Sequence, residues 1–332
     1  EEVKDNRRQA RGRNLEFKTK ESIDQFKTGA SFNHRWNQSS VDTYGFYSSR
    51  NFYGLLPFEF GGIVDLGRNY YGFGSTYTIK SNKGKSENSF QVGYDLAHQE
   101  DERQRFKNLQ GDQGDQTLDQ IESFGSFGVF ALNHFSTGKF LFRTGMRYDR
   151  TKLEVADQFL TNGNQSDANT LTAFNPSIGV GYQLLKNQHL YANFSTSFET
   201  PVLSELSSNP TGEGGFNELL KAQKAKNFEI GYKLKSQFGQ AELALFHIET
   251  SNDIVPFEIE EFPGRTFYKN AGSTHRQGVE ISYSLKLIEN LRVSTGYTYS
   301  KFYYADYKTP SGNFEDKQLP GIPKHMGAIS FN

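Results

Sequence analysis

Three short stretches of the sequence join an arginine to aromatic residues that follow it closely, a combination suited to holding a small anionic molecule. A guanidinium group donates paired hydrogen bonds to anionic oxygens, and aromatic rings present flat faces to cations and to planar surfaces. The alternative is that these residues only pack loops or line an interface. The candidate binding residues are Arg50, Tyr53, Arg68, Tyr70, Tyr71, Arg265 and Tyr268.

Other reactive residue types lack the arrangement that catalysis or metal binding needs. Seven histidines, at positions 34, 98, 134, 189, 247, 275 and 325, show no pair at metal-ligand spacing and no acidic residue three or four positions away on a helix. The acidic stretch 100–119 lacks the alternating ligands of a calcium loop. The chain has no cysteine, and no Ser-His-Asp order or paired carboxylate has supporting context. We therefore predict no catalytic residue, no metal site and no cofactor.

Composition excludes several classes of protein. The 332 residues carry 37 Lys and Arg against 38 Asp and Glu, a formal net charge of −1, so no basic field exists to hold nucleic acid. No stretch approaches the roughly 18 to 20 consecutive apolar residues of a membrane-spanning helix. Aromatic residues make up 15 % of the chain and glycines number 32, yet the mean hydropathy is −0.69. This composition does not exclude a transmembrane β-barrel.

The elements that must position the candidate residues are strands, because side chains alternate with period two. Val279, Ile281, Tyr283 and Leu285 share one face, opposite a polar face that includes Glu280. The same alternation runs through 90–96, 140–149 and 228–235. The polar faces mix signs within a few residues, which predicts that these charges pair with one another or with a plug inside the sheet, rather than forming an acid-base site. The charged positions on those faces are Arg143, Arg147, Asp149, Glu229, Lys233, Glu280 and Lys286.

Short and long connections alternate along the chain. Short ones are predicted near 81–87, 135–138, 185–188, 237–239 and 288–290, and long polar ones at about 100–119, 152–173, 199–225, 252–273 and 305–322. Upstream, a turn near Glu21 and Ser22 and a long segment from about 37 to 67 are predicted to keep the same phase. About thirteen strands of roughly 8 to 15 residues result, with all short turns at one rim.

These features predict an all-β protein, an antiparallel up-and-down transmembrane β-barrel. One strand face would contact lipid and the other would line a wet or plugged interior, which explains the low hydropathy. Aromatic residues near the strand ends would form girdles at the membrane interfaces. The predicted girdle residues are Tyr44, Phe46, Tyr47, Tyr70, Tyr71, Phe198, Phe302, Tyr303 and Tyr304.

Four passages resemble the family of TonB-dependent outer-membrane receptors. Residues 191–206 (YANFSTSFETPVLSEL) resemble its strand-to-loop passage, and 227–233 (NFEIGYK) resemble the strand that follows. Residues 270–280 (NAGSTHRQGVE) are similar to its Asn-Ala-Gly and Arg-x-Gly-Val-Glu passage, and 320–325 (PGIPKH) resemble the start of a late strand. Together and in this order they are fairly specific, and the resemblance fades before residue 120.

The resemblance implies a 22-stranded barrel with an N-terminal plug domain and a TonB-box peptide. We therefore expect residues 1–332 to be an interior barrel segment, roughly the eighth to the twentieth strand, with the plug and C-terminal strands absent. It also implies an outer-membrane, multi-pass location in contact with lipid. The expected function is uptake of a scarce nutrient, a ferric siderophore above all, driven by the TonB-ExbB-ExbD complex through the missing plug. The candidate arginines and aromatics would then contact that cargo, and nucleic acid is not an expected partner.

Other functions stay open at this point. Within the family, cobalamin or an oligosaccharide could be the cargo. A passive porin-type barrel is a different class, which a constriction loop folded inward or a soluble repeat domain upstream would favour. A soluble carbohydrate-binding β protein is a third, which expression as a soluble monomer would support.

Overall fold

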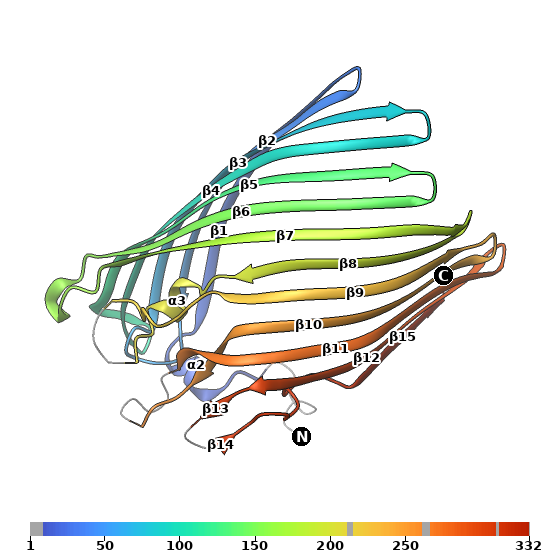
Figure 1. The fold of residues 1–332 in the computed structure, drawn as a ribbon. Helices are drawn as coiled ribbons and strands as arrows, with labels where there is room; N and C mark the ends of the chain where they lie inside the picture. Colours follow the sequence, from blue (N-terminus) through green and yellow to red (C-terminus); the bar gives the residue numbers. More distant parts are fainter. Residues whose placement is uncertain (1–8, 211–214, 261–265, 310–311, 332) are drawn as a thin grey trace.

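One large antiparallel sheet dominates the computed structural model, which describes residues 9–210, 215–260, 266–309 and 312–331 (Figure 1). Within these residues the sheet has 13 strands in chain order, each bonded to its neighbour in sequence. They are β1 (Lys20–Trp36), β2 (Ser39–Leu55), β3 (Ile63–Lys83), β4 (Ser86–Leu109), β5 (Asp112–Thr137), β6 (Phe140–Asp157), β7 (Asp167–Leu185), β8 (Gln188–Glu199), β9 (Gln223–Lys235), β10 (Gly239–Phe257), β11 (Phe267–Ile288), β12 (Leu291–Asp306) and β15 (His325–Phe331).

The smaller elements belong to the connections. Helix α2 (Gly12–Glu16) precedes β1, the 3₁₀ helix η1 (Leu160–Asn162) lies between β6 and β7, and α3 (Leu203–Leu206) follows β8. Strands β13 (Lys308–Thr309) and β14 (Gly312–Asn313) form a separate ribbon between β12 and β15. No helix among the described residues is long and apolar enough to cross a membrane.

The period-two alternation predicted from the sequence is confirmed, and it gives the sheet two different faces. We call outer the face that carries exposed apolar side chains such as Val92, Met146 and Ile230, which are 44 %, 55 % and 62 % exposed. The opposite, inner face carries the charged positions. Arg147 on β6 reaches Asp95 on β4 at 2.9 Å across the intervening β5, a contact that the concave side of a curved sheet favours. The outer face is therefore the one suited to lipid.

Glycines on the inner face make room for large side chains of neighbouring strands. A Cβ at Gly72 would lie 2.5 Å from the ring of Phe46, and one at Gly128 would lie 2.0 Å from Nη2 of Arg147. Arg147 in turn binds Asp149, with Nε 2.8 Å from Oδ1. These glycines are small inner-wall positions, and the charges of this face do pair with one another.

With one exception, the connections gather by length at the two rims (Figure 1); the two-residue β4–β5 turn, Gln110 and Gly111, lies at the rim of the long connections. All five short turns predicted between 81 and 290 are found, and the ends of the strands at the other rim carry α2 and α3. The hairpin tips lie to the right of Figure 1 and the longer connections to the left. The alternating order of connections therefore predicted the polarity of the sheet correctly.

The sequence prediction was wrong about where several strands end. Residues 20–36 are a strand rather than a turn near Glu21 and Ser22, and 37–67 contains all of β2. The stretch 100–119 is no loop, because β4 runs to Leu109 and β5 begins at Asp112. Strands of the large sheet reach 26 residues, far beyond the 9 to 11 that cross a bilayer. Above the lipid both faces meet water, so the apolar-polar alternation that marks a strand disappears while the ladder of hydrogen bonds continues.

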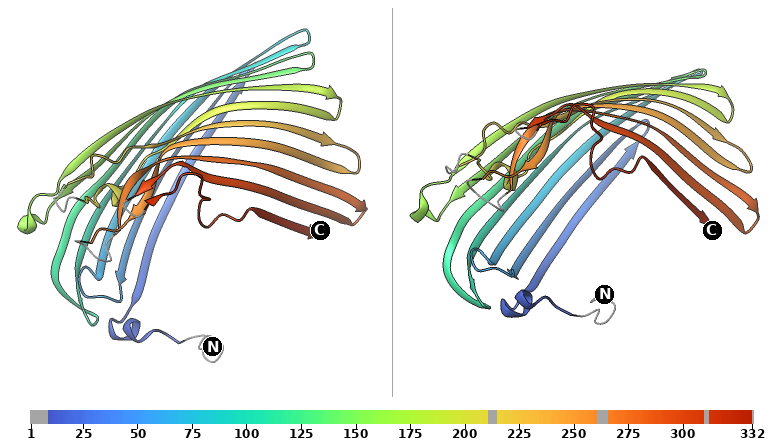
Figure 2. Two further views of the ribbon diagram at one scale, coloured as in Figure 1. Left: turned by 60° about the horizontal axis from the view of Figure 1, so that its bottom comes forward. Right: turned by 90° about the horizontal axis from the view of Figure 1, so that it is seen from below.

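The sheet is curved but does not close on itself (Figure 2). Among the described residues β1 pairs only with β2 at one edge, and β15 pairs only with β12 at the other. Near the long-connection rim, the buried side chain of Asn108 donates from Nδ2 to the carbonyls of Phe17 and Leu56, at 3.1 and 3.0 Å. That amide ties the segment before β1 and the β2–β3 connection to β4.

Candidate binding site

A row of charged side chains crosses the inner face on the parts of β2 to β5 that lie nearest the long connections. Arg50 on β2 is directly opposite Arg68 on β3, Arg68 is opposite Asp101 on β4, and Asp101 is opposite Glu122 on β5. Directly opposite residues share a face. The row therefore stands as one polar band on the inner wall, above the outer-face apolar residues that begin at Tyr71 on β3.

Two ion pairs hold the centre of this band. Nε and Nη2 of Arg68 donate to the two carboxylate oxygens of Asp101 at 2.8 and 2.6 Å, a bidentate arrangement. Nη1 of Arg103 donates to Oε1 of Glu122 at 3.0 Å, and the Gln120 amide donates to the same oxygen. Asp101 is only 1 % exposed, so its charge depends on Arg68 for compensation.

The band holds more positive than negative charge. We call Arg50, Arg68, Arg103 and Arg105 the arginine cluster; in the part of the chain that the structure describes, two of the four form ion pairs, Arg68 with Asp101 and Arg103 with Glu122. Within the described residues the Nε atoms of Arg50, Arg103 and Arg105 are buried without a hydrogen-bond partner. Burial, and after it the neighbouring charge of Arg103, lowers the pKa of Arg105 from its ordinary value. Buried donors and excess positive charge suit an anionic ligand.

An apolar cluster borders the band on its β6 side. Leu206, Phe216 and Leu220, from the connection between β8 and β9, pack on Leu153 and Val155 of the inner face of β6. Val155 lies directly opposite Glu122, so the cluster adjoins the charged row. This connection therefore folds onto the inner wall, and at the rim the site has a polar side and an apolar side.

The structure brings together some of the predicted site residues and separates others. Arg50, Arg68 and Tyr70 share the inner face, and the ring of Tyr70 lies 5.0 Å from that of Phe46. Tyr53 and Tyr71 are on the outer face, because each lies three residues, an odd number, from the arginine on its own strand. Tyr71 contacts the ring of His98 there.

The remaining predicted residues come from the β10–β11 connection and β11. Tyr268 packs against the apolar cluster, and its carbonyl accepts a hydrogen bond from the amide of Asn217 at 3.0 Å. Its position is explained by packing of the β8–β9 connection. Arg265 lies outside the described residues.

Sequence reasoning missed Asp101, Arg103, Arg105 and Glu122. The first three belong to a stretch that was read as a solvated loop because of its charge. No period-two signal marks this stretch, because the outer-face residues between them, Glu100, Glu102 and Gln104, are polar as well.

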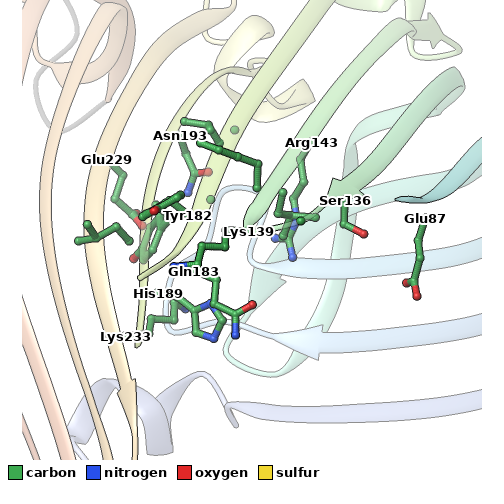
Figure 3. Close-up of a pocket in the computed structure, with 18 of the residues that line it drawn as sticks. Glu87, Ser136, Lys139, Arg143, Tyr182, Gln183, His189, Asn193, Glu229 and Lys233 are labelled. Atoms are coloured by element: carbon green, nitrogen blue, oxygen red, sulfur yellow. The ribbon is translucent and has the colours of Figure 1, made fainter. Parts of the chain in front are cut away.

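A hollow lies on the inner face toward the short turns, with a volume of about 680 Å³ (Figure 3). Its lining mixes apolar side chains with polar ones of both signs, the latter including Arg143, His189, Asn193, Glu229 and Lys233. At its edge, Nζ of Lys233 lies 2.6 Å from Oε1 of Glu242. Charged and polar side chains therefore occur on the inner wall near the short turns as well as near the long connections.

The up-and-down sheet with an apolar outer face agrees with the comparison to protein families. The family described as "TonB dependent receptor-like, beta-barrel" matches residues 3–332. The chain belongs to this family. Receptors and transporters, not enzymes, make up its relatives, which confirms the prediction that the chain has no enzymatic function.

Curated relatives match parts of the sequence. The metal-pseudopaline receptor CntO of Pseudomonas aeruginosa is 28 % identical over 193 residues, which is 56 % of this chain and 25 % of CntO. The probable TonB-dependent siderophore receptor PiuA of Acinetobacter baumannii is 26 % identical over 210 residues, 58 % of this chain and 27 % of PiuA. The matched part therefore spans about a quarter of the length of these relatives.

Solved structures of receptors share the fold. The ferric citrate transporter FecA in its unliganded form has a TM-score of 0.76 at 19 % identity, covering 94 % of this chain and 47 % of FecA. The siderophore receptor PiuA from Acinetobacter baumannii has a TM-score of 0.71 at 15 % identity, covering 94 % and 52 %. The chain thus matches about half of each solved barrel.

Proposed function

We propose that the protein containing this chain is an outer-membrane receptor that takes up a negatively charged ferric chelate of the siderophore class. The arginine cluster carries the proposal. It puts excess positive charge and unpartnered buried donors on the inner wall above the lipid, where a ligand entering from outside would meet it. Carboxylate or catecholate oxygens around Fe³⁺ offer the acceptors that such guanidinium groups need.

Among the predicted residues, Arg50, Arg68 and Tyr70 are the ones we propose for ligand contact. Arg68 is already held by Asp101, whereas no ion pair of Arg50 is found in the described part of the chain. Arg50 is therefore free to bind the ligand without breaking an internal pair. Tyr53, Tyr71 and Tyr268 are better explained by the outer interface and by loop packing.

The names of the relatives support a class of cargo, metal chelates, and not one particular compound. Their names specify metal-pseudopaline, ferric citrate and siderophores, all of which are metal chelates or ligands of metals. Cobalamin and oligosaccharides lack the dense anionic oxygens that the arginine cluster favours. The inward-folded β8–β9 connection would also suit a porin, but it occurs here in a chain of the TonB-dependent receptor family.

For the architecture, we propose that residues 1–332 form an interior barrel segment, with a plug and further strands supplied by the rest of the protein. The support is physical: the open edges at β1 and β15 would leave backbone groups unpaired in lipid, which costs several kcal/mol for each group. A plug would fill the hydrophilic inner wall, including the hollow in Figure 3. Through that plug the TonB-ExbB-ExbD complex would drive uptake.

The binding test uses the complete protein in detergent and titration calorimetry. We expect ferric citrate or a ferric catecholate to bind, and Arg50→Ala to weaken it by about 10- to 100-fold, the value of one hydrogen bond to a charged group. Binding of a neutral ferric hydroxamate should be weakened much less by the same substitution. Arg150→Ala is the matched control, because Arg150 is on the outer face of β6. Equal losses from both variants, or no binding of any ferric chelate, would refute the proposal.

Uptake is tested in cells. A strain lacking the receptor should fail to grow under iron limitation on one defined ferric chelate, and the wild-type gene should restore growth. Restoration should also require a functional TonB protein. Unchanged growth on every ferric chelate would rule out iron as the cargo.

A further inference from the structure

Two histidines and a glutamate meet on the outer face of β10 and β11. His247 and Glu249 are two residues apart on β10, so both side chains point to the same side. Glu249 is directly opposite His275 on β11. One ligand atom from each of the three lies within 4.8 Å of the others, and Nε2 of His247 is already 3.4 Å from Oε1 of Glu249.

This group sits in a row of aromatic side chains that crosses the outer face. The ring centroids of neighbours are 4.9 Å apart between Phe194 and Phe228, and 6.4 Å between Phe228 and His247. They are 5.5 Å apart between His247 and His275, and again between His275 and Tyr303. The row has the form of an interface girdle. At this point of the row, two imidazoles and a carboxylate stand where an ordinary girdle would have tyrosine, tryptophan or phenylalanine side chains.

The hydrogen bonding of this group is incomplete. Nδ1 of His275 is buried and has no partner among the described residues, and the Glu249 carboxylate pairs with His247 at 3.4 Å. Uncharged imidazole nitrogens with a carboxylate oxygen are a common ligand set for Zn²⁺, held at about 2.0 to 2.2 Å from the ion. Side-chain rotations that move the three groups together by about 1 Å would complete that geometry.

We propose that His247, Glu249 and His275 bind a divalent transition-metal ion, such as Zn²⁺, on the outer face of the receptor. The ion would tie β10 to β11 where these strands leave the lipid, with water as a fourth ligand. It is a structural site rather than the cargo site, because the arginine cluster is on the opposite face of the sheet. The proposal therefore does not depend on the proposed cargo.

The test compares zinc binding in matched variants of the complete protein. The protein is stripped with a chelator, dialysed and titrated with ZnCl₂ by calorimetry, and its unfolding temperature is measured with and without zinc. We expect the wild type to bind one more equivalent than His247→Ala, with a zinc-dependent rise in unfolding temperature. Glu249→Gln should lose affinity by at least about tenfold, because even groups that only support a ligand are worth about 10- to 100-fold.

His98 supplies a control of the same kind. His98 and Glu100 also lie two residues apart on the outer face, on β4, but Glu100 is opposite Asn69 and Ser123 rather than a histidine. His98→Ala should leave zinc binding unchanged. His275→Phe keeps an aromatic ring in the girdle while removing the ligand, so it separates loss of metal from loss of packing. Undiminished zinc binding in His275→Phe, or loss in His98→Ala equal to that in His247→Ala, would overturn the proposal.

Discussion

Gly278, within the Arg-x-Gly-Val-Glu passage of β11, is predicted to be a position that tolerates no side chain. It is on the inner face, between β10 and β12. A Cβ there would lie 2.2 Å from the carbonyl oxygen of Tyr299 on β12 and 2.6 Å from the ring of Phe246 on β10. The rings of Phe246 and Phe302 meet edge to face above it, 6.2 Å apart. Gly278→Ala is therefore expected to disturb three strands.

The size of the effect follows from what must move. Phe246 can rotate away, but the Tyr299 carbonyl belongs to the backbone and would have to retreat by about 1 Å, with overpacking of this kind costing about 1 to 3 kcal/mol. The edge-to-face ring pair contributes about 0.5 to 1.5 kcal/mol more if it is lost. We expect the free energy of unfolding to fall by about 2 to 4 kcal/mol, the sum of these two effects.

The matched control is Gly296→Ala on β12, also on the inner face, because a Cβ at Gly296 meets no atom within 4 Å. It should be neutral or stabilising by up to about 1 kcal/mol, since alanine lowers the entropy of the unfolded chain. Urea unfolding of the complete protein in lipid vesicles, followed by tryptophan fluorescence and heat-modifiable gel mobility, gives both values. Equal unfolding free energies for the two variants would refute the packing argument.

Three further predictions concern the lipid-facing side, a buried amide and the infolded connection. Ile230→Lys, on the outer face, should destabilise the barrel by about 2 to 4 kcal/mol in vesicles, whereas Leu219→Lys, 81 % exposed in a connection, should not; equal effects would show that Ile230 does not face lipid. Asn108→Ala leaves buried carbonyls unpaired, at about 1 to 3 kcal/mol for each, and should speed proteolysis within residues 56–62. Phe216→Ala, at a buried aromatic, should cost the packed connection about 3 to 5 kcal/mol, seen as faster hydrogen exchange at 215–222 with unchanged exchange in β6.

The sequence alone determined the fold class, the polarity of the sheet and the family. Period two appears wherever one face meets lipid and the other meets water, so 90–96, 140–149, 228–235 and 279–287 were recognisable as strands. Turn residues marked the short rim. The passage 270–280 also has a physical basis in the structure, because Arg276 binds Asp253 at 3.3 Å and Gly278 leaves room for the ring of Phe246.

Only the tertiary structure decided how far the strands extend and which side chains meet. Beyond the lipid, both faces of a strand are wet, so composition no longer distinguishes a strand from a loop, and 100–109 was misread. Residues of the binding site lie on four strands, and their meeting depends on register, which local sequence does not carry. His247 and Glu249 were overlooked because a helical spacing was tested where the spacing is that of a strand. His275 joins them only across the β10–β11 ladder, so its position depends on register as well.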